Sequence, residues 1–284
     1  MRLNRFTYYL AAVSVLLPGC DSGPDLVQPP TPELSPPSFV VLYDSAVAAA
    51  GWTGEEHRIA MLDVMDDAKA QLAAGTATAT SLTEAAYDAC VATAARRTAD
   101  PSMCADVYAY IAAGGGGTIV SLGAVSGTAL PGDDGGAPFG WQWDYLLAIE
   151  QAAEWMDPAN LDRYITDVET AAMYNEGYTS SLPVFAVGSL TRSSAYQWAA
   201  CNWECLGVSE PTSTLSSGEL GGFVMAKAAF PWRRLLKADV SGAIGGAIGG
   251  SVGGPGALIG GALGGVGASA AEGVIIIGER IGIW

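Results

Sequence analysis

His57 is the single histidine of the chain and the first residue that could support catalysis or bind a metal. A serine hydrolase would need His57 as its general base, but the sequence holds no G-x-S-x-G nucleophile motif. A metal site would combine His57 with carboxylates such as Glu56 or Asp63. Acidic residues are also common at helix N-termini, where they stabilise the helix without any ligand. We therefore expect no catalytic residue, no metal site and no cofactor.

Two pairs of carboxylates, each four residues apart, could act as acid and base in a glycosidase. They are Asp63 with Asp67, and Glu150 with Glu154. Glycoside hydrolysis needs two carboxyl groups facing one cleft, whereas this spacing only places them on one face of a helix. In a chain with 29 acidic and 13 basic residues, a solvated helix face is the expected role.

Four aromatic residues between positions 141 and 155 could form a platform for a sugar or a peptide. They are Trp141, Trp143, Tyr145 and Trp155. Packing in a hydrophobic core is the commoner use of such side chains. Both uses remain open at this point.

Four cysteines of the central region suggest disulfide bonds. They are Cys90, Cys104, Cys201 and Cys205. An even number of cysteines is typical of disulfides in an exported chain. The alternative is a zinc site, but the spacings C-x13-C and C-x3-C match no common zinc motif. Proximity along the chain favours the pairs Cys90–Cys104 and Cys201–Cys205.

Residues 241–269 consist of small and apolar side chains without any charge. Glycines recur there every four residues, which places them on one face of a helix. Such a face lets two helix backbones approach closely, and Pro255 divides the stretch. The pattern predicts a helical hairpin over residues 240–254 and 256–277. Its expected packing positions are Gly242, Gly245, Gly246, Gly249, Gly250, Gly253, Gly256, Gly260 and Gly264.

This hairpin needs a compensating environment, because each glycine in a helix costs about 1 kcal/mol relative to Ala. Tight packing or a lipid bilayer would provide one. The second half is long enough to cross a hydrocarbon core, but Glu272 interrupts it. The basic residues that precede the hairpin suit either an anionic headgroup surface or an ordinary solvated patch. They are Lys227, Arg233, Arg234 and Lys237, with Trp232 among them.

The N-terminus has the three parts of a secretory signal. Arg2 and Arg5 precede a short apolar run over residues 6–17, and Leu17-Pro18-Gly19-Cys20 follows. This last segment resembles the lipobox of bacterial lipoproteins. The resemblance implies cleavage after Gly19 and lipidation of Cys20.

These features divide the chain into four parts. We expect a signal peptide over residues 1–19 and a lipidated, proline-rich tether over 20–38. A mainly helical, disulfide-containing domain over 39–238 follows, and then the glycine-zipper hairpin and an apolar tail over 239–284. The formal net charge of −16 excludes nucleic acid as a partner, because binding it depends on neutralising phosphates.

The elements that must position these residues are expected to be mainly helices. Capping-box patterns at Thr53 with Glu56 and at Ser81 with Glu84 predict helix starts, and Gly75 ends the first helix. Asp100 and Pro101 predict a third helix. Further helices are expected over residues 141–154 and from Pro158 or Asn160 to about 174. A glycine-rich loop is expected over 114–140, turns near Pro183 and Gly207, and short strands at 118–122, 184–187 and 223–225.

Two further resemblances concern short segments only. The glycine-rich hairpin resembles the glycine zippers of outer-membrane lipoproteins of the 17-kDa surface-antigen type and of some bacteriocin precursors. The large acidic part of this chain is absent from the small surface antigens, so their function is not carried over. The segment from Gly54 to Leu62 is similar to a G-x-x-H-N-x-x-L segment of uncharacterised exported bacterial proteins, with Arg58 in place of the asparagine.

The sequence thus predicts a non-enzymatic, lipid-anchored protein of the bacterial cell envelope, periplasmic or surface-exposed. Its expected partner is the lipid bilayer, with the glycine zipper mediating membrane association or self-association. One alternative is a secreted membrane-active or bacteriocin-like factor. The other is a surface binding module in which the zipper is a soluble packing element.

Overall fold

The computed structural model describes residues 36–99, 101–104, 111, 140–208, 230–250 and 256–283. These residues form helices, with no strand among them, so the mainly α fold class is confirmed. The helices are α2 (Pro36–Ala74), α3 (Ala79–Arg96), η1 (Pro101–Cys104), α6 (Gly140–Ala153), α7 (Pro158–Glu176), α8 (Tyr178–Ala199), η2 (Trp203–Leu206), α9 (Trp232–Gly250) and α10 (Gly256–Ile281).

Several predicted features lie outside the described residues. They are the signal peptide, Cys20 and the tether up to residue 35, Asp100, the strands at 118–122 and 223–225, most of the glycine-rich loop, Lys227, Gly253 and Pro255.

The helix α2 starts 17 residues before the predicted cap at Thr53. Thr53 lies inside the helix, where its hydroxyl donates to the carbonyl oxygens of Ala50 at 2.7 Å and of Ala186 in α8 at 3.1 Å. The capping-box interpretation is wrong because the residues before Thr53 are rich in alanine, which favours helix. Two of these alanines, Ala46 and Ala50, are buried in the core. The helix ends as predicted, since Gly75 has φ +68°.

The helix α3 begins one turn before the predicted cap. Thr78 is its N-cap and forms a capping box with Ser81, which is therefore the N3 residue. A disulfide joins Cys90 of α3 to Cys104 of η1, with 5.8 Å between the Cα atoms. This bond fixes the start of the next segment against α3.

The helices α6 and α7 match the predicted ones, and Asp157 caps α7 with Pro158 as its first residue. The strand expected at residues 184–187 is wrong, because these residues lie in the middle of α8. Pro183 is inside this helix as well. Residues 181–188 are all buried, so packing on both sides overrides the local preference for a turn and a strand. The predicted turn at Gly207 is present, with φ +73°.

The glycine stretch forms the predicted hairpin of α9 and α10. The first helix begins earlier than expected, at Trp232, so that Arg233, Arg234 and Lys237 are part of it. The second helix extends to Ile281. The glycines therefore occupy the later part of α9 and the first half of α10.

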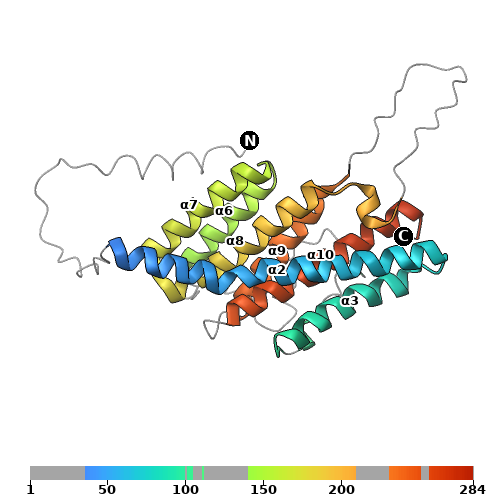
Figure 1. Ribbon diagram of the computed structural model, residues 1–284, viewed down its shortest axis with the longest axis horizontal. Coiled ribbons are helices and arrows are strands. Elements are labelled where there is room, and N and C mark those ends of the chain that lie inside the picture. Colours follow the sequence, from blue (N-terminus) through green and yellow to red (C-terminus); the bar gives the residue numbers. More distant parts are fainter. Residues whose placement is uncertain are drawn as a thin grey trace, which may run out of the picture. The chain divides into compact units, whose positions relative to one another are not determined.

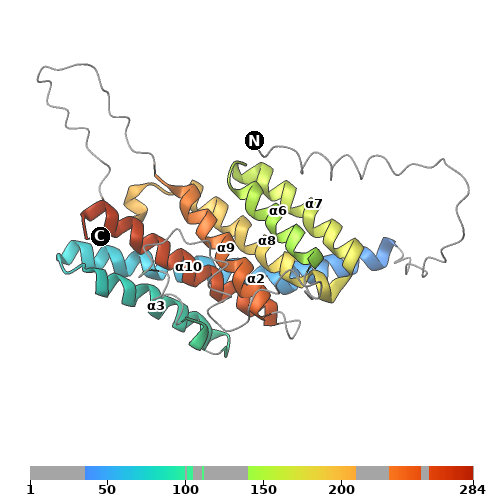
Figure 2. The same ribbon diagram turned by 180° about the vertical axis from the view of Figure 1, so that it is seen from behind.

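The helix α10 lies at the centre of the fold. It packs against α9, α2, α3 and α8. The helices α6 and α7 pack on α8, on the side of the bundle away from α3 (Figure 1). The long helix α2 crosses one face of α8 and α10, in front of them in Figure 1 and behind them in Figure 2. Among the described helices, the stretch Leu258–Ile281 is long and apolar enough to cross a membrane, but 89% of its most apolar window is buried inside the protein.

Candidate functional site

His57 lies fully buried where α2, α8, α9 and α10 meet. Its Nε2 atom is 2.8 Å from Oγ of Ser269 and 3.4 Å from Oδ2 of Asp239, and its Nδ1 atom is 3.3 Å from Oγ of Ser194. The indole nitrogen of Trp198 donates to Oδ2 of Asp239 at 2.6 Å. All five side chains are inaccessible to solvent, so they form a closed polar network in the core.

This network has the residue types of a serine triad, but it is closed to substrates. In a triad the serine contacts one ring nitrogen of the histidine and the carboxylate contacts the other. Here Ser194 and Asp239 do face opposite ring nitrogens of His57, while Ser269 shares Nε2 with Asp239. All of these side chains are inaccessible to solvent, so no substrate can reach either serine. Among the described residues, no group of three His, Cys, Asp or Glu side chains could hold a metal ion. The network therefore connects helices.

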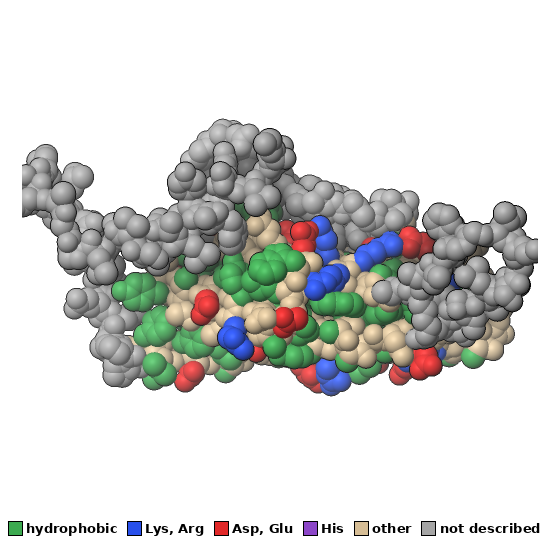
Figure 3. All heavy atoms as spheres, turned by 90° about the horizontal axis from the view of Figure 1, so that it is seen from above, with side chains coloured by type: hydrophobic (Ala, Val, Ile, Leu, Met, Phe, Trp, Pro, Cys, Tyr) green, Lys and Arg blue, Asp and Glu red, His purple; other side chains and the backbone are tan. Residues whose placement is uncertain are grey.

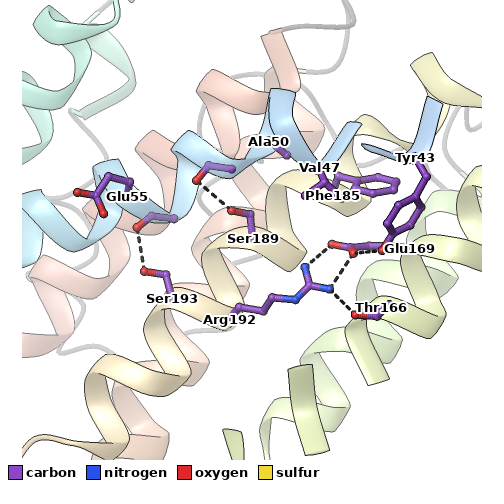
Figure 4. A pocket seen from close by; sticks show the side chains of 12 residues that line it. Tyr43, Val47, Ala50, Glu55, Thr166, Glu169, Phe185, Ser189, Arg192 and Ser193 are labelled. Atoms are coloured by element: carbon purple, nitrogen blue, oxygen red, sulfur yellow. Dashed lines mark hydrogen bonds and ion pairs between the residues drawn. The ribbon is translucent and has the colours of Figure 1, made fainter. Parts of the chain in front are cut away.

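A surface hollow of about 540 Å³ forms a groove between α2, α7 and α8 (Figure 4). Tyr43, Val47 and Phe185 line its apolar end, and Glu169 and Arg192 line its polar end. Its volume is in the range of small-molecule sites. Whether a ligand could bind there depends on whether the polar groups of the groove are already hydrogen-bonded within the protein.

Arg192 is the centre of the polar end. Its Nε donates to Asp162 at 2.6 Å, and its two terminal nitrogens donate to the two oxygens of Glu169 at 2.6 and 2.8 Å. One of these nitrogens also donates to Thr166 at 3.0 Å. The Tyr43 hydroxyl adds a hydrogen bond to Glu169 at 3.2 Å. The guanidinium is thus paired in the two-pronged geometry that makes such pairs strong.

Burial sets the protonation of this cluster. It raises the pKa of Glu169 above its usual range, although Arg192 and Tyr43 act in the opposite direction. Burial, together with the charge of Glu169, also raises the pKa of Tyr43 to about 12. Tyr43 therefore keeps its proton at neutral pH and cannot serve as a base.

The hydroxyl groups of the groove are also used internally. Ser193 donates to the carbonyl oxygen of Gly54 at 3.0 Å, and Ser189 donates to that of Gly51 at 3.4 Å. A Cβ at Gly54 would lie 2.7 Å from the carbonyl oxygen of Ser189, so the glycine allows the close approach of α2 and α8. The side chains of the groove thus hold α2, α7 and α8 together, and their polar groups already have partners within the protein.

The glycine-zipper positions separate into two groups. Gly242, Gly246, Gly260 and Gly264 lie in the contact between α9 and α10, where a Cβ on Gly242, Gly246 or Gly264 would overlap the backbone of the opposite helix. Gly245 and Gly256 are only half-buried, and Gly249 and Gly250 lie in the last turn of α9. One glycine row of α9 therefore meets the row of α10.

The basic residues before the hairpin bind other parts of the protein. Arg234 forms ion pairs with Glu272 and Glu279 of α10, and Lys237 pairs with Glu154 at 2.6 Å. Figure 3 shows basic and acidic side chains beside one another on one face of the molecule. Arg234 and Lys237 thus join α9 to its neighbours. Neither of the two predicted roles, contact with lipid headgroups or an ordinary solvated patch, accounts for these ion pairs.

The two remaining cysteines are free thiols in this structure. Cys201 and Cys205 are half-buried and unbonded, so the predicted disulfide between them is not formed. Burial, with a further contribution from Cys205, raises the pKa of Cys201 to about 12. Disulfide formation proceeds through a thiolate, and this environment disfavours it.

The predicted carboxylate pairs do not share a cleft. Asp63 and Asp67 are exposed on α2, where Asp67 accepts a hydrogen bond from Gln71. Glu150 accepts a hydrogen bond from Ser241 of α9 at 2.5 Å, and Glu154 binds Lys237. The second pair thus attaches α6 to α9.

The four aromatic residues do not form one platform. Trp141 lies in the first turn of α6. Trp143 and Tyr145 are partly buried and pack against the hydrophobic core. Trp155 follows the end of α6 and is 67% exposed. Core packing therefore applies to the middle pair and not to Trp155.

Two clusters were missed by reasoning from the sequence. Asp162, Thr166 and Glu169 recur at helical spacing and share one face of α7, a signal that was available. Their partner Arg192 lies on another helix, and no local pattern indicates that pairing. The contact of Trp198 with Asp239 joins residues 41 positions apart and has no signal in the sequence.

Comparison of the chain with protein-family models, with curated proteins and with solved structures finds no match.

Proposed function

We propose that this chain is a non-enzymatic, lipid-anchored protein of the cell envelope whose helical domain stands outside the bilayer. In this proposal the lipid on Cys20 provides the attachment, and the glycine zipper is the inner packing element of the domain. The observation that carries the proposal is the burial of α10 by α9, α2, α3 and α8.

The packing of the zipper supports this division of roles. Glycines in a helix need compensation, and the close backbone contact at Gly242, Gly246 and Gly264 provides it within the protein. Polar groups also join the hairpin to the other helices, through Ser269 to His57 and through Asp239 to Trp198. A hairpin held in this way does not need a bilayer to satisfy it.

Membrane fractionation of the Cys20→Ala variant tests the proposal. The wild-type protein should sediment with membranes, and Cys20→Ala should move to the soluble fraction. Cys205→Ala is the matched control and should remain with the membranes. Membrane association of Cys20→Ala that resists washing in alkaline carbonate, in protein shown by mass spectrometry to have lost its signal peptide, would show an inserted hairpin and overturn the proposal. A wild-type protein that is soluble would also overturn it.

A membrane-active protein is the second candidate, favoured by the apolar stretch Leu258–Ile281. Insertion would require α10 to leave the bundle and to break the contacts of Ser269 with His57 and of Glu272 with Arg234. Dye release from phospholipid vesicles tests this candidate. Vesicles that stay intact with micromolar protein would exclude it, whereas release would favour it over the anchored domain.

A further inference from the structure

The turn between α6 and α7 carries a second, shallow hollow of about 400 Å³. Its walls include an indole, a phenol, a guanidinium and carboxylates. They belong to Trp155, Tyr164, Arg163, Asp157 and Asp167, and Met156 and Asn160 complete the lining. The indole of Trp155 is 67% exposed, although a side chain of this size is highly buried in most proteins.

The backbone under Trp155 is firmly held. The guanidinium of Arg233 donates to the carbonyl oxygens of Ala153, Trp155 and Met156, at 3.5, 3.2 and 3.2 Å. On the other side of the turn, Asp157 accepts hydrogen bonds from the backbone of Ala159 and Asn160. The exposed indole therefore projects from a fixed turn, and a preformed site loses less freedom when it binds.

Of the described polar side chains around the indole, several are unpaired, in contrast to those of the groove at Arg192, whereas Asp157 and Asn160 bind each other. Within the part of the chain that the structure describes, the side chains of Trp155, Arg163, Tyr164 and Asp167 have no hydrogen-bond or ion-pair partner. Arg163 offers donors, Asp167 offers acceptors, and the Tyr164 hydroxyl offers both. A ligand would meet a flat apolar ring bordered by unused groups of both kinds.

This combination matches the chemistry of a pyranose ring. One face of such a sugar is lined by C–H bonds and stacks on an aromatic ring, while the hydroxyl groups at its edge both donate and accept hydrogen bonds. The carboxylates of Asp157 and Asp167 oppose a polyanionic ligand or an anionic membrane surface. A purely apolar partner would leave Arg163 and Asp167 desolvated without compensation.

We propose that this hollow binds a neutral sugar unit of a glycan. Trp155 is the stacking platform, and Arg163 and Asp167 hold the hydroxyl groups. The inference goes beyond the proposed envelope function and does not depend on lipid attachment, so the result of the fractionation experiment neither supports nor removes it.

Calorimetric titration of the full chain with neutral tetrasaccharides of glucose, of mannose and of N-acetylglucosamine tests the inference. At least one probe should bind, and Trp155→Ala should weaken its binding at least tenfold. Asp167→Asn and Arg163→Ala should each weaken it severalfold. Circular dichroism should show unchanged helix content in each variant.

Tyr174→Ala is the matched control, because Tyr174 is 76% exposed on α7, the helix that carries Arg163 and Asp167, and does not line the hollow. It should bind the sugar as tightly as the wild type, within a factor of two. The inference is overturned if none of the three probes binds or if Trp155→Ala binds as tightly as the wild type. It is also overturned if Trp155 proves necessary for binding phospholipid vesicles while no sugar binds.

Discussion

The contact of Gly264 with α9 leads to a quantitative prediction for the variant Gly264→Ala. A Cβ at this position would overlap the carbonyl oxygen of Gly242 and lie 3.0 Å from both Cα and N of Gly246. These are backbone atoms, and they cannot turn aside as the end of a side chain can. The alanine must therefore push α9 and α10 apart.

The size of the effect follows from two opposing terms. Alanine stabilises a helix by about 1 kcal/mol relative to glycine. Overpacking a close contact costs about 1–3 kcal/mol, and a clash with backbone belongs at the upper end. The expected net loss is about 2 kcal/mol, which should lower the Tm of a domain of this size by about 4–8 °C.

Gly273→Ala is the matched control on the same helix. A Cβ there would lie 3.9 Å from the nearest atom, Cδ2 of Leu235, which is an ordinary contact. Only the helix-propensity term remains, so Tm should rise by about 2–4 °C. Thermal unfolding followed by circular dichroism at 222 nm measures both variants. A Gly264→Ala protein as stable as the wild type would refute the close glycine packing.

Three further predictions concern the other clusters. Arg192→Gln leaves Glu169 buried without its cation and should lower the free energy of unfolding in urea by about 3 kcal/mol, whereas the exposed pair partner Arg58, changed to Gln, should have little effect. The pKa of Tyr43 is raised to about 12, and an unfolded tyrosine titrates near 10. The contribution of Tyr43 to the free energy of unfolding is therefore fully present below pH 10 and is lost as the pH rises toward 12. Tyr43→Phe should reduce this alkaline loss of stability. Equal profiles of stability against pH for the two proteins would contradict the assignment. Alkylation of the unfolded protein without reductant should label Cys201 and Cys205 and leave Cys90 and Cys104 unmodified, and mass spectrometry of the peptides would reveal any other pattern.

The sequence predicts the helices well where the local signals agree with the packing. The end of α2 at Gly75 and the start of α7 at Pro158 are examples, because a positive φ and a proline in the first turn are local requirements. The prediction fails at α8, where Pro183 and the short apolar run over residues 184–187 indicate a turn and a strand. Burial on both sides of α8 decides its structure, and burial depends on helices far away in the chain.

The same limit applies to the polar sites. The glycine spacing predicts the hairpin, and yet the sequence does not show that the partner of each glycine face is the other half of the same hairpin. His57 has no neighbours in the sequence that indicate Asp239 or Ser269, because those residues lie on other helices. Arg192 likewise meets Asp162 and Glu169 only after α7 and α8 have packed.

The glycine contact between α9 and α10 has a consequence for the alignment of the two helices. Glycines recur every four residues on both, so sliding one helix by four residues, about 6 Å, would bring glycine onto glycine again. Glycine contacts alone would thus tolerate several alignments of nearly equal energy. The ion pairs of Arg234 with Glu272 and Glu279 occur at one alignment only, and so does the meeting of Asp239 and Ser269 at His57. The few polar residues of the hairpin therefore select one alignment from a repetitive surface that cannot select it by itself.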